Sequence, residues 1–260
     1  MKALCGFRSL LQIVSFALCV DMVLTPTPAL AHGGDDVALE MIDPAPRTSG
    51  RVELAFRLEQ QEEHRWLSDQ DLAISHERKL HLFLFDPALS EFRHIHPEFL
   101  NGAWRVSTDL AVNGNYWIWA QGEIANGGGE FTADSRLEVQ GGATANPLPP
   151  VLGDIRSGGD GASQLSLSRQ KIRPLTSIML TMTFSRADGS APELTPYLGA
   201  IAHVVAVPVS GDKILHVHPM WHADQWMIHT TFPKAGDYRL WAQFVDAGVL
   251  KTVPLSVHVE

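Results

Sequence analysis

Two stretches of this sequence are nearly the same: GNYWIWAQ at residues 114–121 and GDYRLWAQ at residues 236–243. Shifting the chain by the 122 residues that separate them aligns residues 71–121 with residues 193–243 without a gap. Tryptophan and histidine, which are rare residues, fall at matching positions throughout the aligned block. The sequence therefore contains an internal duplication.

Both copies have the residue pattern of β-structure. Apolar and other side chains alternate in RVELAFRL (51–58) and in SIMLTMTF (177–184), as expected of strands with one buried face. The Gly-x-Tyr start of the two matching stretches is typical of the tyrosine corner of immunoglobulin-like domains, in which a second disulfide cysteine would fall at Ile118 and Leu240. We expect an all-β protein made of two tandem immunoglobulin-like β-sandwich domains.

Composition changes along the chain suggest where the two domains begin and end. We expect the first β-sandwich over residues 37–141 and the second over residues 165–260. The stretch between them, 142–164, is rich in Gly, Pro and Ser and is predicted to be a linker. Two strands, KLHLFLFD (79–86) and AHVVAVPV (202–209), are apolar on both faces and are expected at the centre of their sheets.

The N-terminus has the features of a secretory signal peptide. Lys2 and Arg8 precede an apolar run that ends in Ala29-Leu30-Ala31, a cleavage sequence of small residues. Asp21 interrupts the run, which is then shorter than the ~20 residues that a membrane span needs. We expect residues 1–31 to be removed, leaving a periplasmic or secreted protein with no membrane span.

Removal of this segment restricts the chemistry of the remaining chain. The only two cysteines, Cys5 and Cys19, lie within it, so the mature protein would have no disulfide, thiolate metal site or cysteine nucleophile. The formal net charge changes from −9 to −10, because Lys2, Arg8 and Asp21 are lost. This negative charge disfavours nucleic acid as a partner.

The duplicated block contains a histidine motif in each copy, His-x12-His-x-His-Pro. Its histidines are His81, His94 and His96 in the first copy and His203, His216 and His218 in the second. Residues i and i+2 of a strand share a face, so the two histidines of each pair point together. The first histidine lies on the same face as this pair only if the hairpin loop has an even number of residues. The turn sequences DPALSE and PVSGDK do not determine the length of the loop.

Three imidazoles from two adjacent strands would make a metal site with an open position, suited to a copper ion or, alternatively, a zinc ion. Four further residues are less certain candidate ligands: His32, at the new N-terminus, and Met220, His222 and His229 near the second motif. A soft methionine ligand would favour copper. The alternative is that these histidines are structural residues at the ends of apolar rows.

The motif, followed by a Gly-x-Tyr strand, resembles secreted bacterial proteins found with heavy-metal and copper-handling systems. The β-sandwich fold and the mature N-terminal His32 are also loosely similar to periplasmic copper-resistance proteins of the CopC type. The resemblance implies the fold class and an association with copper, but it assigns no ligands.

Three functions are compatible with these features. We expect a metal-binding protein that buffers or delivers copper, or less favourably zinc, with a membrane metal transporter or envelope protein as its partner. One alternative is a metal-free immunoglobulin-like interaction module of an envelope complex. The other is a zinc-dependent hydrolase, which is disfavoured because the sequence contains no H-E-x-x-H or G-x-S-x-G motif. We therefore expect that the protein is not an enzyme.

Overall fold

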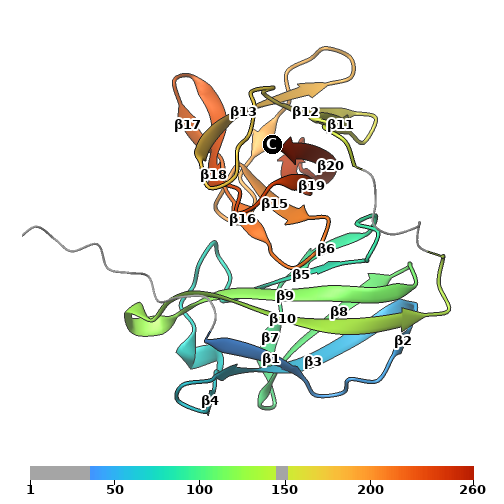
Figure 1. Cartoon of the computed structure of the whole chain (residues 1–260), viewed down its shortest axis with the longest axis vertical. Helices are drawn as coiled ribbons and strands as arrows, with labels where there is room; N and C mark the ends of the chain where they lie inside the picture. Colours follow the sequence, from blue (N-terminus) through green and yellow to red (C-terminus); the bar gives the residue numbers. More distant parts are fainter. Residues whose placement is uncertain (1–35, 145–151) are drawn as a thin grey trace, which may run out of the picture. The chain divides into compact units, whose positions relative to one another are not determined.

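The computed structural model describes residues 36–144 and 152–260, and regular structure there is almost entirely β-strand (Figure 1). The expected signal peptide 1–31, His32 and part of the expected linker lie outside the described residues. Within the described part, helical structure is confined to two short 3-10 turns, η1 (Asp69–Asp71) and η2 (Ala125–Gly127). None of the described helices has the length and apolar character needed to cross a membrane.

The first repeat consists of two five-stranded sheets. The strands of one sheet are β1 (Val37–Met41), β3 (Gly50–Gln60), β4 (Arg65–Trp66), β7 (Glu98–Leu100) and β8 (Ala103–Leu110). Those of the other are β2 (Arg47–Thr48), β5 (Leu80–Phe85), β6 (Phe92–Ile95), β9 (Gly114–Ile124) and β10 (Gly129–Gln140). The orders β1-β3-β8-β7 and β2-β10-β9-β5-β6 correspond to the two sheets of an immunoglobulin-like sandwich.

The second repeat has the same arrangement. One sheet contains β11 (Ser157–Gly159), β12 (Ser163–Leu167), β13 (Ser177–Arg186), β18 (Gln225–Thr231) and β17 (Met220–His222), in that order. The other contains β14 (Leu194–Thr195), β15 (Ala202–Pro208), β16 (Leu215–Val217), β19 (Gly236–Asp246) and β20 (Val249–Val259). The protein thus has two tandem immunoglobulin-like β-sandwiches.

Strands β11 and the start of β12 lie inside the stretch 142–164 that the sequence assigned to a linker, so the second sandwich begins before residue 165. The glycines that suggested a linker allow close approach of strands instead. A Cβ atom on Gly158 would lie 2.6 Å from the carbonyl oxygen of Pro254, and one on Gly159 would lie 2.5 Å from that of Ser163. Only glycine fits such contacts with neighbouring backbone.

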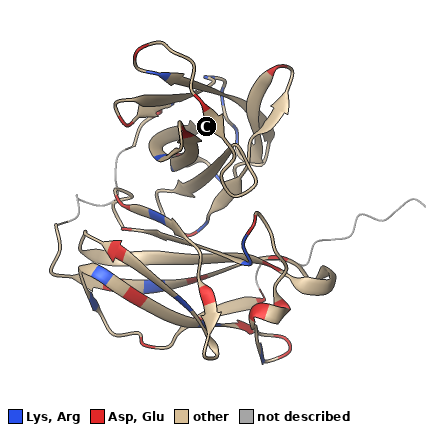
Figure 2. Ribbon diagram, turned by 180° about the vertical axis from the view of Figure 1, so that it is seen from behind, with Lys and Arg blue, Asp and Glu red and all other residues tan. Residues whose placement is uncertain are grey.

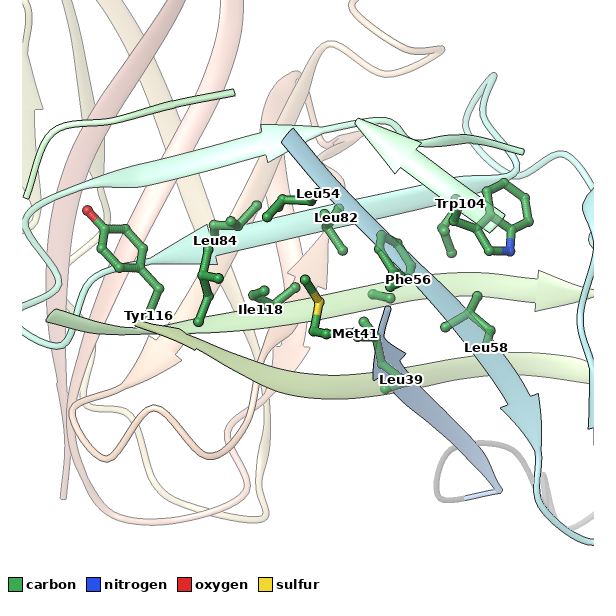
Figure 3. Packing of buried hydrophobic residues seen from close by; sticks show 14 of the residues in the cluster. Leu39, Met41, Leu54, Phe56, Leu58, Leu82, Leu84, Trp104, Tyr116 and Ile118 are labelled. Carbon is green, nitrogen blue, oxygen red and sulfur yellow. The ribbon is translucent and has the colours of Figure 1, made fainter. Parts of the chain in front are cut away.

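Each sandwich encloses its own hydrophobic core, and Figure 3 shows that of the first repeat. Leu54 and Phe56 from β3 face Leu82 from β5 and Ile118 from β9 across the space between the sheets. The alternating apolar residues of the sequence are the ones that point inward. Burying each such side chain contributes about 1.5–3 kcal/mol to folding, so these two faces hold the sheets together.

The expected tyrosine corners are present in both repeats. The hydroxyl of Tyr116 donates to the carbonyl of Val112 at 3.1 Å, and that of Tyr238 donates to the carbonyl of Lys234 at 2.9 Å. These bonds fix the chain where β9 and β19 begin.

A third apolar cluster joins the two repeats, which belong to one compact unit, His32–Glu260. Its buried members are Phe83, Phe85, Leu89, Phe92 and Trp119 from the first repeat and Val205, Val207 and Trp241 from the second, with Leu152. Trp241 stacks on Phe92 with ring centroids 4.5 Å apart and planes at 8°. Strands β5 and β15 are therefore apolar on both faces because one face lines a sandwich core and the other packs against the neighbouring repeat.

Charged side chains are spread over the strands. Figure 2 shows acidic and basic residues interspersed on the first repeat, without a broad area of one sign in that view. The whole chain has 20 basic and 29 acidic residues, which gives a formal net charge of −9.

Candidate metal centre

The loop of the first hairpin brings all three histidines of that motif to one face. Strands β5 and β6 pair Phe83 with His94 and Phe85 with Phe92, and the same register places His81 opposite His96. The connecting loop, residues 87–90, has four residues. The Asp86 carboxylate accepts the backbone N–H groups of Ser90 and Glu91, both at 2.7 Å, which holds the loop at that length.

The second hairpin has the equivalent register. Val205 pairs with His216, which is the first pairing shifted by 122 residues, and His203 lies opposite His218. A tight turn, in which the Gly211 N–H donates to the Pro208 carbonyl at 2.8 Å, connects the strands. Gly211 has φ of +72°, which favours glycine at this position. Both motifs therefore present three histidines on one face.

The imidazole nitrogens of each triad converge. In the second triad, Nδ1 of His203 lies 3.1 Å from Nε2 of His216 and 2.8 Å from Nε2 of His218. In the first triad, Nδ1 of His81 lies 3.0 Å from Nε2 of His94. Nitrogens bound at about 2.0–2.1 Å to one ion are about 2.9 Å apart at right angles and about 3.4 Å apart at the tetrahedral angle. These short distances suit nitrogens bound to the same ion, and in each triad one nitrogen from every histidine lies within 4.8 Å of the other two, so each triad could hold an ion.

Backbone carbonyls determine the tautomer of the first histidine in each triad. Nε2 of His81 lies 3.1 Å from the carbonyl oxygen of Ser75, and Nε2 of His203 lies 2.7 Å from that of Tyr197. A carbonyl oxygen can only accept a hydrogen bond, so Nε2 carries the proton in both rings. Nδ1 of the neutral His81 and His203 rings therefore carries no proton, and its lone pair points into the triad.

Glutamine side chains from the opposite repeat determine the tautomer of the second histidine. Nδ1 of His94 lies 2.8 Å from Oε1 of Gln243, and Nδ1 of His216 lies 2.9 Å from Oε1 of Gln121. In this orientation of the Gln243 amide its oxygen faces His94 and its Nε2 donates to the Thr252 hydroxyl at 3.1 Å. With the amide oxygens facing the rings, Nδ1 is the protonated atom in both histidines, and Nε2 carries a lone pair.

Two lone pairs therefore face each other at 3.0 Å between His81 and His94, and at 3.1 Å between His203 and His216. Neutral rings in these tautomers cannot make a hydrogen bond there, and their lone pairs repel. Nε2 of His96 is also buried without a hydrogen-bond partner. A cation at the centre of each triad would satisfy these atoms, so the donor set fits a metal ion.

Burial keeps the histidines neutral, which is the form that binds metal. Burial, together with the nearby histidines, lowers the pKa of His96 and His218 to about 3 and that of His203 to about 4. The pKa values of His94 and His216 are well below the usual value for the same reason. Protons therefore do not compete for these nitrogens at neutral pH.

The less certain candidate ligands do not join the triads in the described part of the chain. Met220 and His222 are exposed on β17, and His229 is exposed on β18, where it contacts the Ser177 hydroxyl. These strands belong to the other sheet of the second sandwich. The neighbour of His229, Ile228, points into the core, so His229 points away from it.

Gln121 and Gln243 also contribute to the site, although the histidine motif did not point to them. Both belong to the repeated Trp-Ala-Gln sequence, so their recurrence was a usable signal. What could not be read from the sequence was that each glutamine contacts a histidine of the other repeat. These contacts between the repeats form because the sheet with β5 and β9 packs against the sheet with β15 and β19 through the third apolar cluster.

Removal of one glutamine should weaken one triad selectively. In Gln243→Leu, the Nδ1–H of His94 is buried without an acceptor, and we expect metal affinity at the first triad to fall about 10- to 100-fold. The matched variant Gln121→Leu should weaken the second triad through His216. Competition titrations against a chromophoric chelator measure both sites. Unchanged affinities in both variants would show that these hydrogen bonds do not orient ligands.

Comparisons with known proteins do not assign a particular activity. Residues 157–260 match the family model described as a domain of unknown function, DUF8832. A search of curated proteins gave no match. The resemblance to copper-resistance proteins therefore stays a prediction.

Solved structures give distant likenesses. The fibronectin(III)-like modules of Clostridium thermocellum CbhA are 10% identical over 85% of this chain and 94% of theirs, with a TM-score of 0.24. An ICAM-5 D1–D4 ectodomain fragment is 14% identical over 85% of this chain and 53% of its own, with a TM-score of 0.22. A putative membrane anchored protein from Corynebacterium diphtheriae is 8% identical over 87% of this chain and 59% of its own, with a TM-score of 0.25. The immunoglobulin-like class is defined by the strand order described above.

Proposed function

We propose that this protein binds metal ions, one at each histidine triad, and buffers or delivers them outside the cytoplasm. The observation that carries the proposal is the pair of facing lone pairs in each triad, at 3.0 and 3.1 Å, held by hydrogen bonds on the opposite sides of the rings. Such hydrogen bonds are typical of metal-binding histidines.

Copper is the favoured ion and zinc the alternative. Both accept imidazole, but the Irving–Williams order places Cu²⁺ above Zn²⁺ for a given nitrogen site. Three ligands leave an open coordination position, which suits a site that takes up and releases its ion. A membrane metal transporter or another envelope protein is the proposed partner.

The interaction-module alternative is favoured by one observation. On the edge strand β17, Met220 and Trp221 are 48% and 58% exposed, which could serve a protein contact. Under this alternative the triads only pack between the repeats, and metal has no effect.

Isothermal titration with Cu²⁺ and Zn²⁺ tests the proposal. We expect two ions per chain for the native protein, and binding at neither triad in the double variant His96→Ala/His218→Ala, because each triad loses one ligand. The control His64→Ala/His258→Ala removes two exposed histidines outside the triads and should bind like the native protein. Affinity weaker than ~10 µM in the native protein, or equal binding by the first double variant, would rule the proposal out.

A further inference from the structure

A seventh histidine lies beside the second triad although it belongs to the first repeat. The side chain of His76 is exposed, and its ring centroid is 3.7 Å from that of His218, with the planes at 31°. It is also 6.0 Å from His203 and 6.4 Å from His216. His76 therefore approaches all three members of the second triad.

A tight turn places His76 there. Ser75 and Arg78 exchange backbone hydrogen bonds at 2.8 and 3.1 Å, and His76 between them has φ of 49°. The carbonyl of Ser75 is the acceptor that orients His81. One turn of the first repeat thus orients a ligand of the first triad and presents His76 to the second.

A small cavity of about 70 Å³ lies between these side chains. It is lined by His76, His81, His216 and His218, together with Ser75, Gln121, Gly122 and Glu130. A cavity of this size is large enough for a metal ion or a few water molecules. His76 is exposed, so it stands where the cavity meets solvent and can rotate without disturbing a core.

We propose that His76 is a fourth ligand of the second metal site, which makes the two sites unequal. The proposal rests on the metal-binding function proposed above. Ring centroids within the second triad are 4.5 Å apart for His203–His218 and His216–His218, and 5.4 Å apart for His203–His216. His76 is closer than this to the ring of His218, at 3.7 Å, and 0.6–1.0 Å beyond this range from the rings of His203 and His216, so a rotation of its exposed side chain is needed to bring it to a coordinating position.

Among the described residues, no histidine outside the triads approaches all three members of the first triad; His76 comes near only His81, with ring centroids 6.4 Å apart. The corresponding turn, Tyr197–Ala200, has the same backbone form, and Leu198 stands at the position of His76 with φ of 49°. Leucine cannot bind metal. The second site is therefore four-coordinate through protein ligands and holds its ion more tightly, whereas the first keeps an open position for exchange.

The test is the variant His76→Leu, which copies the residue of the first site's turn. In chelator competition with Zn²⁺, the native protein should show two classes of site. His76→Leu should still bind two ions, but the tighter class should weaken about tenfold or more, towards the affinity of the other. His64→Leu is the control, since His64 is also exposed with positive φ, at 48°, and should leave both affinities unchanged.

The electron paramagnetic resonance spectrum of the protein loaded with Cu²⁺ gives an independent readout, because loss of an imidazole nitrogen changes the signal of the second site alone. Binding of two ions with affinities and spectrum unchanged by His76→Leu would overturn this inference. Equal weakening of both sites would also overturn it. Failure of the native protein to bind Cu²⁺ or Zn²⁺ would instead overturn the proposed function itself.

Discussion

Saturation with Cu²⁺ is expected to raise the melting temperature of this protein by at least about 8 °C. An ion that binds only the folded chain stabilises it by about 4 kcal/mol per site when its free concentration is 1,000 times the dissociation constant. In a chain of this size each kcal/mol corresponds to about 2–4 °C. Binding would also remove the repulsion between the lone pairs of His81 and His94.

Differential scanning calorimetry with and without Cu²⁺ measures this shift, and a chelator should reverse it. The variant His96→Ala/His218→Ala should show a much smaller shift, because each triad lacks a ligand. A melting temperature that Cu²⁺ leaves unchanged in the native protein would favour the metal-free interaction module.

The substitution Trp241→Ala is expected to lower the free energy of unfolding strongly. The indole is 3% exposed and stacks on Phe92, and its centroid is 6.0 Å from that of Phe85. Its removal leaves a cavity between the repeats, and we expect a loss of about 3–5 kcal/mol in the free energy of unfolding. Since Gln243 lies two residues further along β19, the first triad should also bind metal more weakly.

Urea unfolding measures this loss. Trp66→Ala is the matched control, because that indole is 44% exposed and should cost little. If Trp241→Ala were no more destabilising than Trp66→Ala, the third apolar cluster would not hold the repeats together.

Much of the fold could be predicted from the sequence because its signals are local. The 122-residue repeat, the period-two patterns and the Gly-x-Tyr starts together indicated two immunoglobulin-like sandwiches. Ile118 and Leu240, at the positions of an immunoglobulin cysteine, are both fully buried. These features depend on the burial of one strand face, which the residue pattern records directly.

The geometry of the triads could not be predicted because it depends on the parity of two hairpin loops. In the first hairpin, the Asp86 carboxylate accepts three backbone N–H groups, from Ala88, Ser90 and Glu91, and so selects a four-residue loop. The sequence suggested a turn at Asp86-Pro87 but not its length. A loop one residue shorter would have placed His81 on the opposite face.

Contacts between the repeats were also beyond prediction. The apolar outer faces of strands β5 and β15 were attributed to central positions in a sheet, and not to packing of one repeat on the other. The same packing brings Gln121 to His216, Gln243 to His94 and His76 to His218. Residues more than 90 positions apart meet here, and a sequence pattern carries no record of such pairings.

Crystals grown with Cu²⁺ provide the most direct test of metal binding at the triads, through anomalous diffraction at the copper edge. We predict one peak in each triad, about 2.0–2.1 Å from Nδ1 of the first histidine and from Nε2 of the second and third. In the second triad these atoms belong to His203, His216 and His218. Anomalous peaks only at exposed histidines such as His64 or His258, with none inside either triad, would contradict the assignment.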